Sequence, residues 1–429
     1  MQVFLKSFGC SANLADGEVL AGCLAQAGFR LAASEAEADV LIYNTCAVKE
    51  PTENRVINVM KHVPKGKKLI VAGCLPMINF ERLLREVHFD GAVGPSVGGG
   101  IADVVARVAA GEKVVDLDRL KQKPKLDLPR IKSNPVVSVV PISYGCLGSC
   151  SYCCVATARG QLRSCSVKEV ADRVQSDVAE GAREVWVTSQ DTASYGRDLH
   201  TDLAELLHVL GDLPGDFRVR VGMMTPDRIT DMQDRLIDAF RSDKVFKFLH
   251  LPVQSGDNNS LKRMRRFYTT TEFRSIVDSF RAQFPELTLA TDVIVGFPGE
   301  TRQAFEKTLE LLEEVKPDVT NVSKFFARPK TAAAKMRKGL VEQEEIKRRS
   351  MIAARLVKGI SLNRNLRWVG WVGEVLVDEK GKVEGSWVGR NFAYKPVVVK
   401  GRKNLLGEIV RVNVVEASIT YLKGVIVEI

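Results

Sequence analysis

The sequence predicts an α/β protein in three parts: an N-terminal parallel α/β domain, a central partial (β/α)6 barrel and a small C-terminal β-barrel. Short β-rich runs alternate with helical stretches over most of the 429 residues, which favours parallel sheets. A Lys- and Pro-rich segment interrupts this alternation at residues 121–135, and the helical period disappears near Arg367. The predicted division is an N-terminal domain at 1–115, a linker at 116–135, the barrel at 136–365 and the tail at 366–429.

Three cysteines in the N-terminal domain follow the ends of predicted strands. The β-rich runs of this domain are VFLKSF, DVLIYN, KLIVAG and DGAVG, at residues 3–8, 39–44, 68–73 and 90–94. Cys10, Cys46 and Cys74 each come within a few residues of the end of one of the first three runs. Because the carboxyl ends of parallel strands meet at one edge of a sheet, we expect these thiols to converge on a site. The alternative is three small buried cysteines.

The central part contains six βα units. Its predicted strands are VVSVVPIS, EVWVTS, RVRVGM, KFLHLPVQ, LTLATDVIVG and DVTNVSKFFA. Three helices have the pattern of a capping box, in which side chains satisfy free backbone donors; these begin at Ser166–Glu169, Thr230–Gln233 and Thr269–Glu272. A charged helical stretch at residues 341–359 precedes the tail. In such barrels the chemistry takes place at the carboxyl ends of the strands.

The tail has a strand-like, Gly-punctuated pattern. It holds three of the four tryptophans, Trp368, Trp371 and Trp387, and ten basic against seven acidic residues. We expect a small β-barrel of the size used for nucleic-acid binding. An inert structural cap is the alternative.

The composition indicates a cytosolic protein with a polyanionic partner. A net charge of +10 and a pI near 9.1 favour binding to phosphates. No apolar run approaches the roughly 20 residues of a membrane span, and the N-terminus lacks the pattern of a secretory signal. We therefore expect no membrane partner.

The cysteines suit metal or redox chemistry better than a disulfide scaffold. Their number, nine, is odd, and clustered thiols in a reducing cytosol usually bind metal. The five histidines do not follow zinc-finger spacing, and we expect them to be packing or surface residues: His62, His88, His200, His208 and His250.

Four of these thiols lie in one loop, YGCLGSCSYCCVATARG, which follows the first predicted barrel strand. Cys146, Cys150 and Cys153 have the spacing C-x3-C-x2-C, close enough to hold three corners of one cubic iron-sulfur cluster and leave the fourth iron open. Zinc is the rival, although structural zinc prefers four ligands. We expect three other cysteines to be non-ligands: Cys23, Cys154 and Cys165.

With this spacing at the end of a first barrel strand, the chain resembles the radical S-adenosylmethionine (SAM) superfamily, and as a whole it resembles its methylthiotransferase family. The N-terminal domain matches at GCSANLADGE, NTCAVKEPTENR and AGCLP, and the central part at TSQDTASYGRD, HLPVQSGDNNSLKRMRR, TDVIVGFPGET and FFARPKTAAAKM. The tail, with VGRNFAYKPVVVKG and LLGEIVRVNVVEASITYLKG, resembles the TRAM domain of that family. The resemblance covers nearly the whole chain.

The resemblance implies two 4Fe-4S clusters, each with an open iron. It assigns Cys146, Cys150 and Cys153 to the cluster that cleaves SAM to methionine and a 5′-deoxyadenosyl radical, which abstracts a hydrogen atom from an unactivated carbon. It assigns Cys10, Cys46 and Cys74 to an auxiliary cluster that carries the sulfur, which a second SAM methylates. An electron donor protein or other reductant and a sulfur donor are then required partners.

The residues that we consider for binding SAM are Ser189, Gln190, Asp191, Gln254, Gly296 and Gly299. The first three end the second barrel strand, where capping of that strand would explain them equally well. The two glycines resemble the adenine-contacting turn of the superfamily, although Asp292 stands where Gly is common, and a tight turn alone would also explain them.

The motifs of the loop favour one branch of the family. CSYCCVATARGQLRS resembles the archaeal and eukaryotic enzymes that methylthiolate C2 of N6-threonylcarbamoyladenosine, next to the tRNA anticodon. The run KRMRR at residues 262–266 could contact an RNA backbone or form a solvated helix face. The alternative functions are methylthiolation of a ribosomal-protein aspartate, and a noncatalytic iron-sulfur protein that binds RNA.

Overall fold

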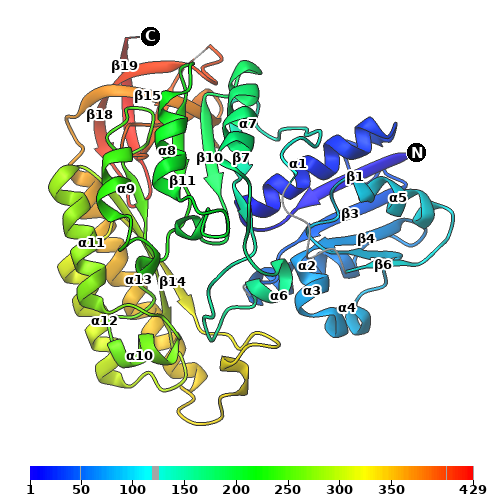
Figure 1. Ribbon diagram of the computed structural model, residues 1–429, viewed down its shortest axis with the longest axis horizontal. Helices are drawn as coiled ribbons and strands as arrows, with labels where there is room; N and C mark the ends of the chain where they lie inside the picture. The colour runs from blue at the N-terminus through cyan, green and yellow to red at the C-terminus, as the bar shows by residue number, and fades with distance from the viewer. Residues whose placement is uncertain (49, 118–124, 402, 429) are drawn as a thin grey trace.

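The computed structural model describes residues 1–48, 50–117, 125–401 and 403–428. Figure 1 shows the N-terminal sheet, in blue to cyan, beside the parallel strands and outer helices of the central part, with the C-terminal barrel above them. The three-part α/β architecture predicted from the sequence is confirmed.

The N-terminal sheet has six parallel strands in the order β2-β1-β3-β4-β5-β6. The strands are β1 (Gln2–Ser7), β2 (Arg30–Leu31), β3 (Val40–Thr45), β4 (Lys68–Gly73), β5 (Gly91–Val93) and β6 (Val114–Asp116). The helices are α1 (Ser11–Gln26), α2 (Glu50–Lys61), α3 (Cys74–Ile78), α4 (Phe80–Glu86) and α5 (Ile101–Ala109). The sequence did not predict the edge strands β2 and β6, because two or three residues are too few to show an alternating pattern.

Both faces of this sheet are buried, as the continuous apolar runs require. Helices α1 and α5 cover one face, where Leu24 and Val105 pack on Ile42 and Ile70. Helices α2, α3 and α4 cover the other face, where Tyr43 lies in the core.

The central part consists of two three-stranded parallel sheets, β11-β10-β7 and β12-β13-β14. A parallel bridge between Val219 and Val245 joins them into one curved surface. The strands are β7 (Val137–Pro141), β10 (Glu184–Thr188), β11 (Arg218–Val221), β12 (Phe248–His250), β13 (Thr288–Val295) and β14 (Val319–Lys324). The helices are α7 (Val167–Ala179), α8 (Leu203–Asp212), α9 (Gln233–Ala239), α10 (Asn258–Arg263), α11 (Thr270–Gln283), α12 (Arg302–Val315) and α13 (Gln343–Leu366).

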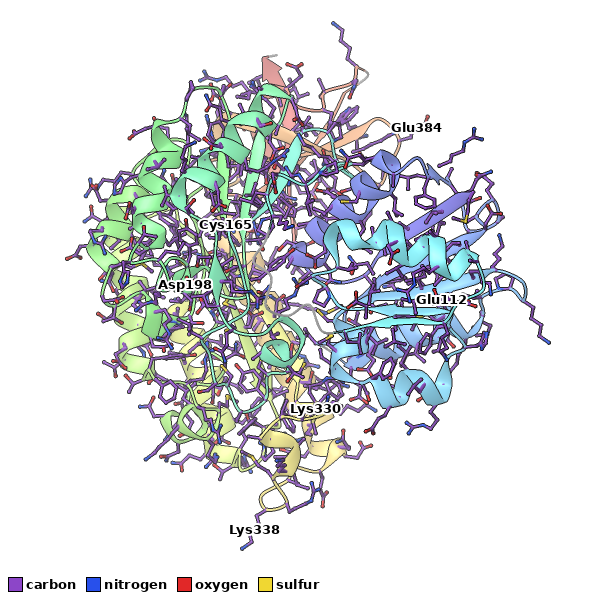
Figure 2. All side chains as sticks on the ribbon, turned by 45° about the vertical axis from the view of Figure 1, so that its right-hand side comes forward. Glu112, Cys165, Asp198, Lys330, Lys338 and Glu384 are labelled. Carbon is purple, nitrogen blue, oxygen red and sulfur yellow. The ribbon has the colours of Figure 1, made fainter. Side chains whose placement is uncertain are left out.

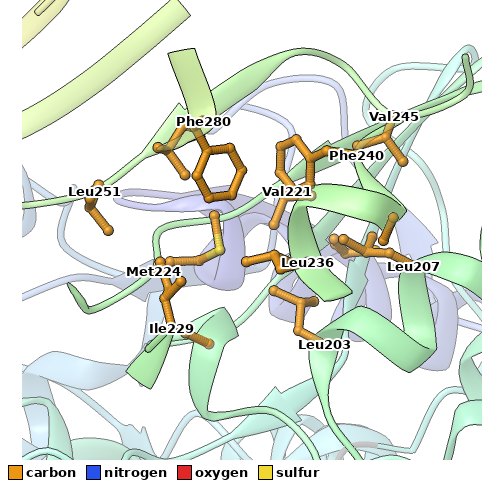
Figure 3. Packing of buried hydrophobic residues seen from close by; sticks show 14 of the residues in the cluster. Leu203, Leu207, Val221, Met224, Ile229, Leu236, Phe240, Val245, Leu251 and Phe280 are labelled. Carbon is orange, nitrogen blue, oxygen red and sulfur yellow. The ribbon is translucent and has the colours of Figure 1, made fainter. Parts of the chain in front are cut away.

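These strands and helices enclose the largest hydrophobic core of the protein (Figure 3). Phe240 and Phe280 meet edge to face, with ring centroids 5.4 Å apart. A short hairpin, β8 (Ser143–Tyr144) with β9 (Arg163–Ser164), brackets the cysteine loop and helix α6 (Val155–Arg159). The cysteine loop is therefore held at both of its ends.

Two of the three predicted capping boxes are present. Ser166 and Glu169 cap helix α7, and Thr269 and Glu272 cap helix α11. The prediction for Thr230–Gln233 is wrong, because helix α9 begins only at Gln233 and Met232 occupies its N-cap position.

The C-terminal strands form a closed barrel in the order β15-β16-β17-β19-β18. They are β15 (Val372–Lys380), β16 (Ser386–Arg390), β17 (Pro396–Lys400), β18 (Ile409–Ala417) and β19 (Leu422–Glu428). The buried ammonium group of Lys395 joins the barrel to the central part, because it donates to Asp318 at 2.9 Å and to Asn365 at 2.8 Å.

The segment that precedes the central part packs against both the central part and the N-terminal part. Residues 118–124, which include part of the predicted linker, lie outside the described residues. Beyond them, Arg130 forms an ion pair with the buried Asp177 of helix α7. Ser133 donates from its backbone to Glu18 of helix α1 at 2.9 Å. Although burial disfavours its charge, hydrogen bonds from Arg173 and Arg130 hold the pKa of Asp177 below its usual range.

Within the described part of the chain, each helix is too short or too polar to cross a lipid bilayer.

Candidate functional site

The three N-terminal cysteines lie together at one edge of the sheet; we call them the N-terminal triad. Cys10 follows β1 and is the N-cap of α1, Cys46 follows β3, and Cys74 is the first residue of α3 after β4. Because β1, β3 and β4 are parallel neighbours, their carboxyl ends bring the three thiols to one cavity of about 560 Å³, called the larger cavity. The convergence predicted from the strand ends is confirmed.

The turns that carry these cysteines are closely packed. Gly9 and Gly73 have positive φ angles of 131° and 91°. A Cβ atom on Gly9 would lie 2.5 Å from that of Cys46, and one on Gly73 would lie 2.5 Å from the carbonyl oxygen of Thr45. Only glycine fits at these two positions without displacement of a neighbour.

A buried arginine from the central part lies beside the N-terminal triad. Arg159, at the end of α6, is 3% exposed and forms an ion pair with Asp16 at 2.6 Å. Burial raises the pKa of the Cys74 thiol to about 12, and the charge of Arg159 acts against this rise. A guanidinium group at this position therefore favours the thiolate form, which is the form that binds metal.

The second set of cysteines, Cys146, Cys150 and Cys153, lies in the loop between β8 and α6; we call it the loop triad. These cysteines line a cavity of about 210 Å³, the smaller cavity. The backbone N–H of Gly148 donates to Cys146 Sγ at 3.1 Å, and Arg266 Nη1 donates to Cys150 Sγ at 3.2 Å. Burial raises the pKa of Cys146 to about 11, so its thiolate needs such donors or a metal.

The other three cysteines lie in packed interiors. Cys23 is on α1 and packs against the N-terminal sheet, and Cys154 packs in the core on the other face of this sheet. Cys165, labelled in Figure 2, lies within the central core. Cys74 of the N-terminal triad belongs to the same core as Cys154, so burial does not separate the two groups, and the expectation that these three are not ligands stays a prediction.

The two cavities adjoin. Val48, Val155, Gln190 and Met223 line both of them. The Oε1 atom of Gln190 is shielded from solvent and has no hydrogen-bond partner among the described residues. A buried acceptor of this kind needs a donor, and it lies where both cavities could offer one from a bound molecule.

The other predicted SAM-binding residues differ in position. Asp191 and Gln254 line the smaller cavity, and Ser189 lines the larger one. Asp191 also accepts from the backbone of Thr225 at 2.9 Å, so part of its role is structural. The turn glycines Gly296 and Gly299 are not among the residues that line either cavity.

Those two glycines serve a tight turn. Their φ angles are 78° and 84°. The backbone N–H of Gly296 donates to Glu300 at 2.7 Å, and the N–H of Gly299 donates to the carbonyl oxygen of Gly339 at 2.6 Å. This geometry favours the alternative that a tight turn alone accounts for both.

The run 262–266 does not form a uniform basic face. Met264 and Arg266 are buried, whereas Lys262, Arg263 and Arg265 are exposed. Arg266 faces the loop triad, so its side chain is not free to contact RNA.

Sequence reasoning missed several residues that line the larger cavity. His250 Nε2 lies 2.7 Å from Asp292 Oδ2, and Asn321 donates to the other oxygen of this carboxylate at 2.8 Å. Arg159 and Arg220 line the same cavity. Isolated His and Arg residues carry no spacing signal, although the position of His250 at the end of β12 could have identified it.

Each triad offers three cysteine sulfurs, which are donors that suit an iron-sulfur cluster or zinc. Among the residues that the structure describes, no three His, Cys, Asp or Glu side chains lie close enough to share one metal ion. A zinc ion needs every sulfur donor at about 2.3 Å, whereas thiolates that bind different irons of one cluster lie farther apart.

Polar contacts hold the N-terminal and central parts together across a surface that we call the seam. Ser11 and Thr188 share a hydrogen bond of 2.7 Å between their hydroxyl groups. The buried Glu53 of α2 forms an ion pair with Arg328, which follows β14. Together with the pair of Asp16 and Arg159, these contacts fix the two triads relative to one another.

The fold and the loop triad define a radical SAM enzyme. Residues 140–312 match the radical SAM superfamily, residues 2–94 match the uncharacterized protein family UPF0004, and residues 367–427 match the TRAM domain. Membership of the radical SAM superfamily implies a 4Fe-4S cluster and SAM as cofactors.

Full-length relatives identify the family within that class. The "Probable threonylcarbamoyladenosine tRNA methylthiotransferase" of Pyrococcus horikoshii is 39% identical over 433 residues and covers 100% of both chains. The threonylcarbamoyladenosine tRNA methylthiotransferase of Homo sapiens is 34% identical over 433 residues, which cover 99% of this chain and 73% of the human one. The chain belongs to the threonylcarbamoyladenosine tRNA methylthiotransferase family.

A solved structure shares the fold at much lower identity. The radical SAM methyltransferase TsrM of Kitasatospora setae, with tryptophan and a SAM analog bound, has a TM-score of 0.58 and 13% sequence identity. The match covers 94% of this chain and 80% of that one.

Proposed function

We propose that this protein adds a methylthio group to C2 of N6-threonylcarbamoyladenosine in tRNA, next to the anticodon. The observation that carries this proposal is the placement of two cysteine triads on two adjoining cavities. Transfer of a methylthio group to an unactivated carbon needs a radical source and a sulfur carrier within reach of the same atom. The relatives described above act on this nucleoside according to their names.

The division of labour between the triads follows from their positions. We assign the loop triad to the 4Fe-4S cluster that supplies the electron for SAM cleavage, and the N-terminal triad to a second 4Fe-4S cluster that carries the sulfur. Arg266 and Arg159 each place a positive charge beside one triad, which offsets the negative charge of its thiolates.

The residues between the triads bind and enclose the reactants. Gln190 offers its unpartnered Oε1 to a donor of SAM or of the substrate base. Asp191, Gln254 and Ser189 add polar groups to the cavity walls. The apolar side chains shared by both cavities exclude water and other quenchers of a radical.

The remaining partners follow from the reaction. We propose that the C-terminal barrel at 366–429, the TRAM domain, binds tRNA, with the net charge of +10 favouring the phosphates. We further propose an external reductant, a sulfur donor and a cytoplasmic location, where thiols stay reduced. The N-terminal domain at 1–115 and the barrel at 136–365 would each supply one cluster.

The test is nucleoside mass spectrometry on tRNA that carries threonylcarbamoyladenosine, after incubation with anaerobically reconstituted protein, SAM and a reductant. We expect the 2-methylthio nucleoside together with 5′-deoxyadenosine. Matched reactions contain tRNA without the threonylcarbamoyl group, or ribosomal protein. A methylthioaspartate in place of the nucleoside would identify the ribosomal-protein function, and absence of 5′-deoxyadenosine would indicate a noncatalytic RNA-binding protein.

A further inference from the structure

Arg220, on strand β11, lies between three aromatic rings at the wall of the larger cavity. The carbon of its guanidinium group is 5.3 Å from the ring centroid of Trp186, 5.2 Å from that of Phe248 and 5.4 Å from that of Tyr394. The rings come from strands β10 and β12 and from the C-terminal barrel. The same cavity contains the N-terminal triad.

Among the described residues, no carboxylate forms an ion pair with this guanidinium group. The Arg220 side chain makes no hydrogen bond to a described residue, and its Nε atom is shielded from solvent without an acceptor. Aromatic rings attract a guanidinium group through their faces, but they cannot accept its in-plane N–H bonds as a carboxylate does. Arg220 is half-buried, and those of its N–H bonds that have no acceptor among the described residues can be satisfied by an incoming anion.

The other charged groups on this cavity are already paired. Arg159 binds Asp16. The carboxylate of Asp292 is held by His250 and Asn321. Arg220 is therefore the cation that remains available to a ligand within the described lining of the cavity.

The nucleoside of the proposed reaction carries a suitable anion. Its N6 substituent is a carbamoyl-linked threonine, whose free α-carboxylate distinguishes it from unmodified adenosine. A planar guanidinium group can bind a carboxylate through two parallel N–H bonds, and this geometry also fixes the orientation of the bound group.

We propose that Arg220 binds the carboxylate of the threonylcarbamoyl group and thereby selects the modified adenosine. This inference rests on the proposed function and adds the part of the site that recognises the side group. Because Arg220 and the N-terminal triad line one cavity, binding of the carboxylate would hold the base beside the sulfur carrier.

The experiment compares two anticodon stem-loop RNAs that differ in one group. One carries threonylcarbamoyladenosine, and the other carries the neutral carboxamide of the same threonine. Both are measured with the reconstituted enzyme, first by binding without reductant and then by kcat/KM for methylthiolation. We expect the wild type to prefer the carboxylate by about 10- to 100-fold in both measurements, as charged hydrogen bonds do.

Substitution of Arg220 tests the cause of this preference. We expect Arg220→Gln to bind and modify both RNAs at the low level of the carboxamide, so that the preference falls to about one. Arg220→Lys should recover part of the preference, because it restores the charge without the two-pronged geometry.

Arg390→Gln is the matched control. Arg390 also lies over the ring of Tyr394, at 4.9 Å, but it is paired with Asp378 and is not among the lining residues of the cavity. This variant removes a cation from the same aromatic cluster and should keep the preference. A purely structural role of Arg220 would make both variants alike.

The outcomes separate this proposal from the proposed function. A wild type that treats both RNAs alike, or an Arg220→Gln variant that loses activity equally on both, would overturn the carboxylate site. If the binding preference disappears in Arg220→Gln while the wild type forms no methylthio nucleoside, the carboxylate site stands and the proposed reaction fails.

Discussion

The two cysteine triads are assembled in different ways. The loop triad lies within eight residues of one loop, residues 146–153, and hydrogen bonds from Gly148 and Arg266 support it. The N-terminal triad joins residues 10, 46 and 74, which meet because three strands are parallel neighbours. Its arginine, Arg159, comes from across the seam.

Because of this difference, the N-terminal triad depends on the docking of the N-terminal part against the central part. The loop triad is held within the central part, by the hairpin, the barrel strand before it and the hydrogen bond from Arg266. The N-terminal triad needs the sheet to form and the central part to dock, because Arg159 pairs with Asp16 only across the seam. Loss of one triad should therefore leave the other measurable, and the effects should be unequal.

The largest effect is expected from removal of one ligand of each triad. Cys150→Ala should abolish formation of 5′-deoxyadenosine, whereas Cys46→Ala should retain it and lose only methylthio transfer. Each variant should contain about four irons per chain in place of about eight, because three thiolates hold each cluster. Iron analysis and product chromatography measure these results; equal loss of 5′-deoxyadenosine in both variants would contradict the assignment.

A smaller effect is expected from the arginine at the seam. Arg159→Gln leaves the buried Asp16 without its ion pair and should destabilise the protein by about 3–5 kcal/mol in denaturant titration. It should also lower iron at the N-terminal triad while the loop triad stays loaded.

The control for that variant is Glu53→Gln, which breaks the other buried ion pair across the seam, with Arg328. We expect a similar loss of stability but normal iron content. Equal iron loss in both variants would mean that Arg159 acts through docking alone.

Substitution of Arg266, which donates to the loop triad, should change the formation of 5′-deoxyadenosine more than the free energy of unfolding. Arg266→Met removes the N–H donor to Cys150 Sγ, and loss of a hydrogen bond to a cluster sulfur makes its reduction potential more negative. We expect a decrease of about 10- to 100-fold in 5′-deoxyadenosine formation, as is typical when a group that supports a metal ligand is removed. A redox titration followed by electron paramagnetic resonance measures the shift, and the exposed Lys262→Met variant should show none.

The smallest effect on the reaction is expected at Glu184, which lines neither cavity and lies where the central part contacts the C-terminal barrel. Burial and the nearby charge of Asp378 raise the pKa of Glu184 to about 7. A carboxyl group whose folded pKa lies above its unfolded value stabilises the fold at low pH, and this contribution is lost as the pH rises through about 7.

Glu184→Gln cannot ionise, so its free energy of unfolding should decline less than that of the wild type between pH 5 and pH 8. Thermal unfolding across this range measures the difference. The wild type and the Glu184→Gln variant should bind equal amounts of iron. If the free energy of unfolding depends on pH in the same way in both proteins, Glu184 does not titrate in this range.

Much of the fold follows from local patterns. Strands β3 and β4 were predicted from their continuous apolar runs, and helices α7 and α11 from capping residues whose hydrogen bonds are internal to the first turn. The prediction at Thr230 is wrong because the capping pattern also occurs where a helix begins later. The edge strands β2 and β6 form only because an existing sheet offers them partners.

The sequence alone determined the loop triad, because a spacing of a few residues limits how far its thiols can separate. It also indicated the N-terminal triad through the strand ends, since parallel strands have a common direction. Only the tertiary structure decided which charged side chains join these sites. Arg159, Arg220 and His250 reach the larger cavity from different strands and helices. Such contacts depend on the packing of whole domains, and no short-range pattern in the chain encodes them.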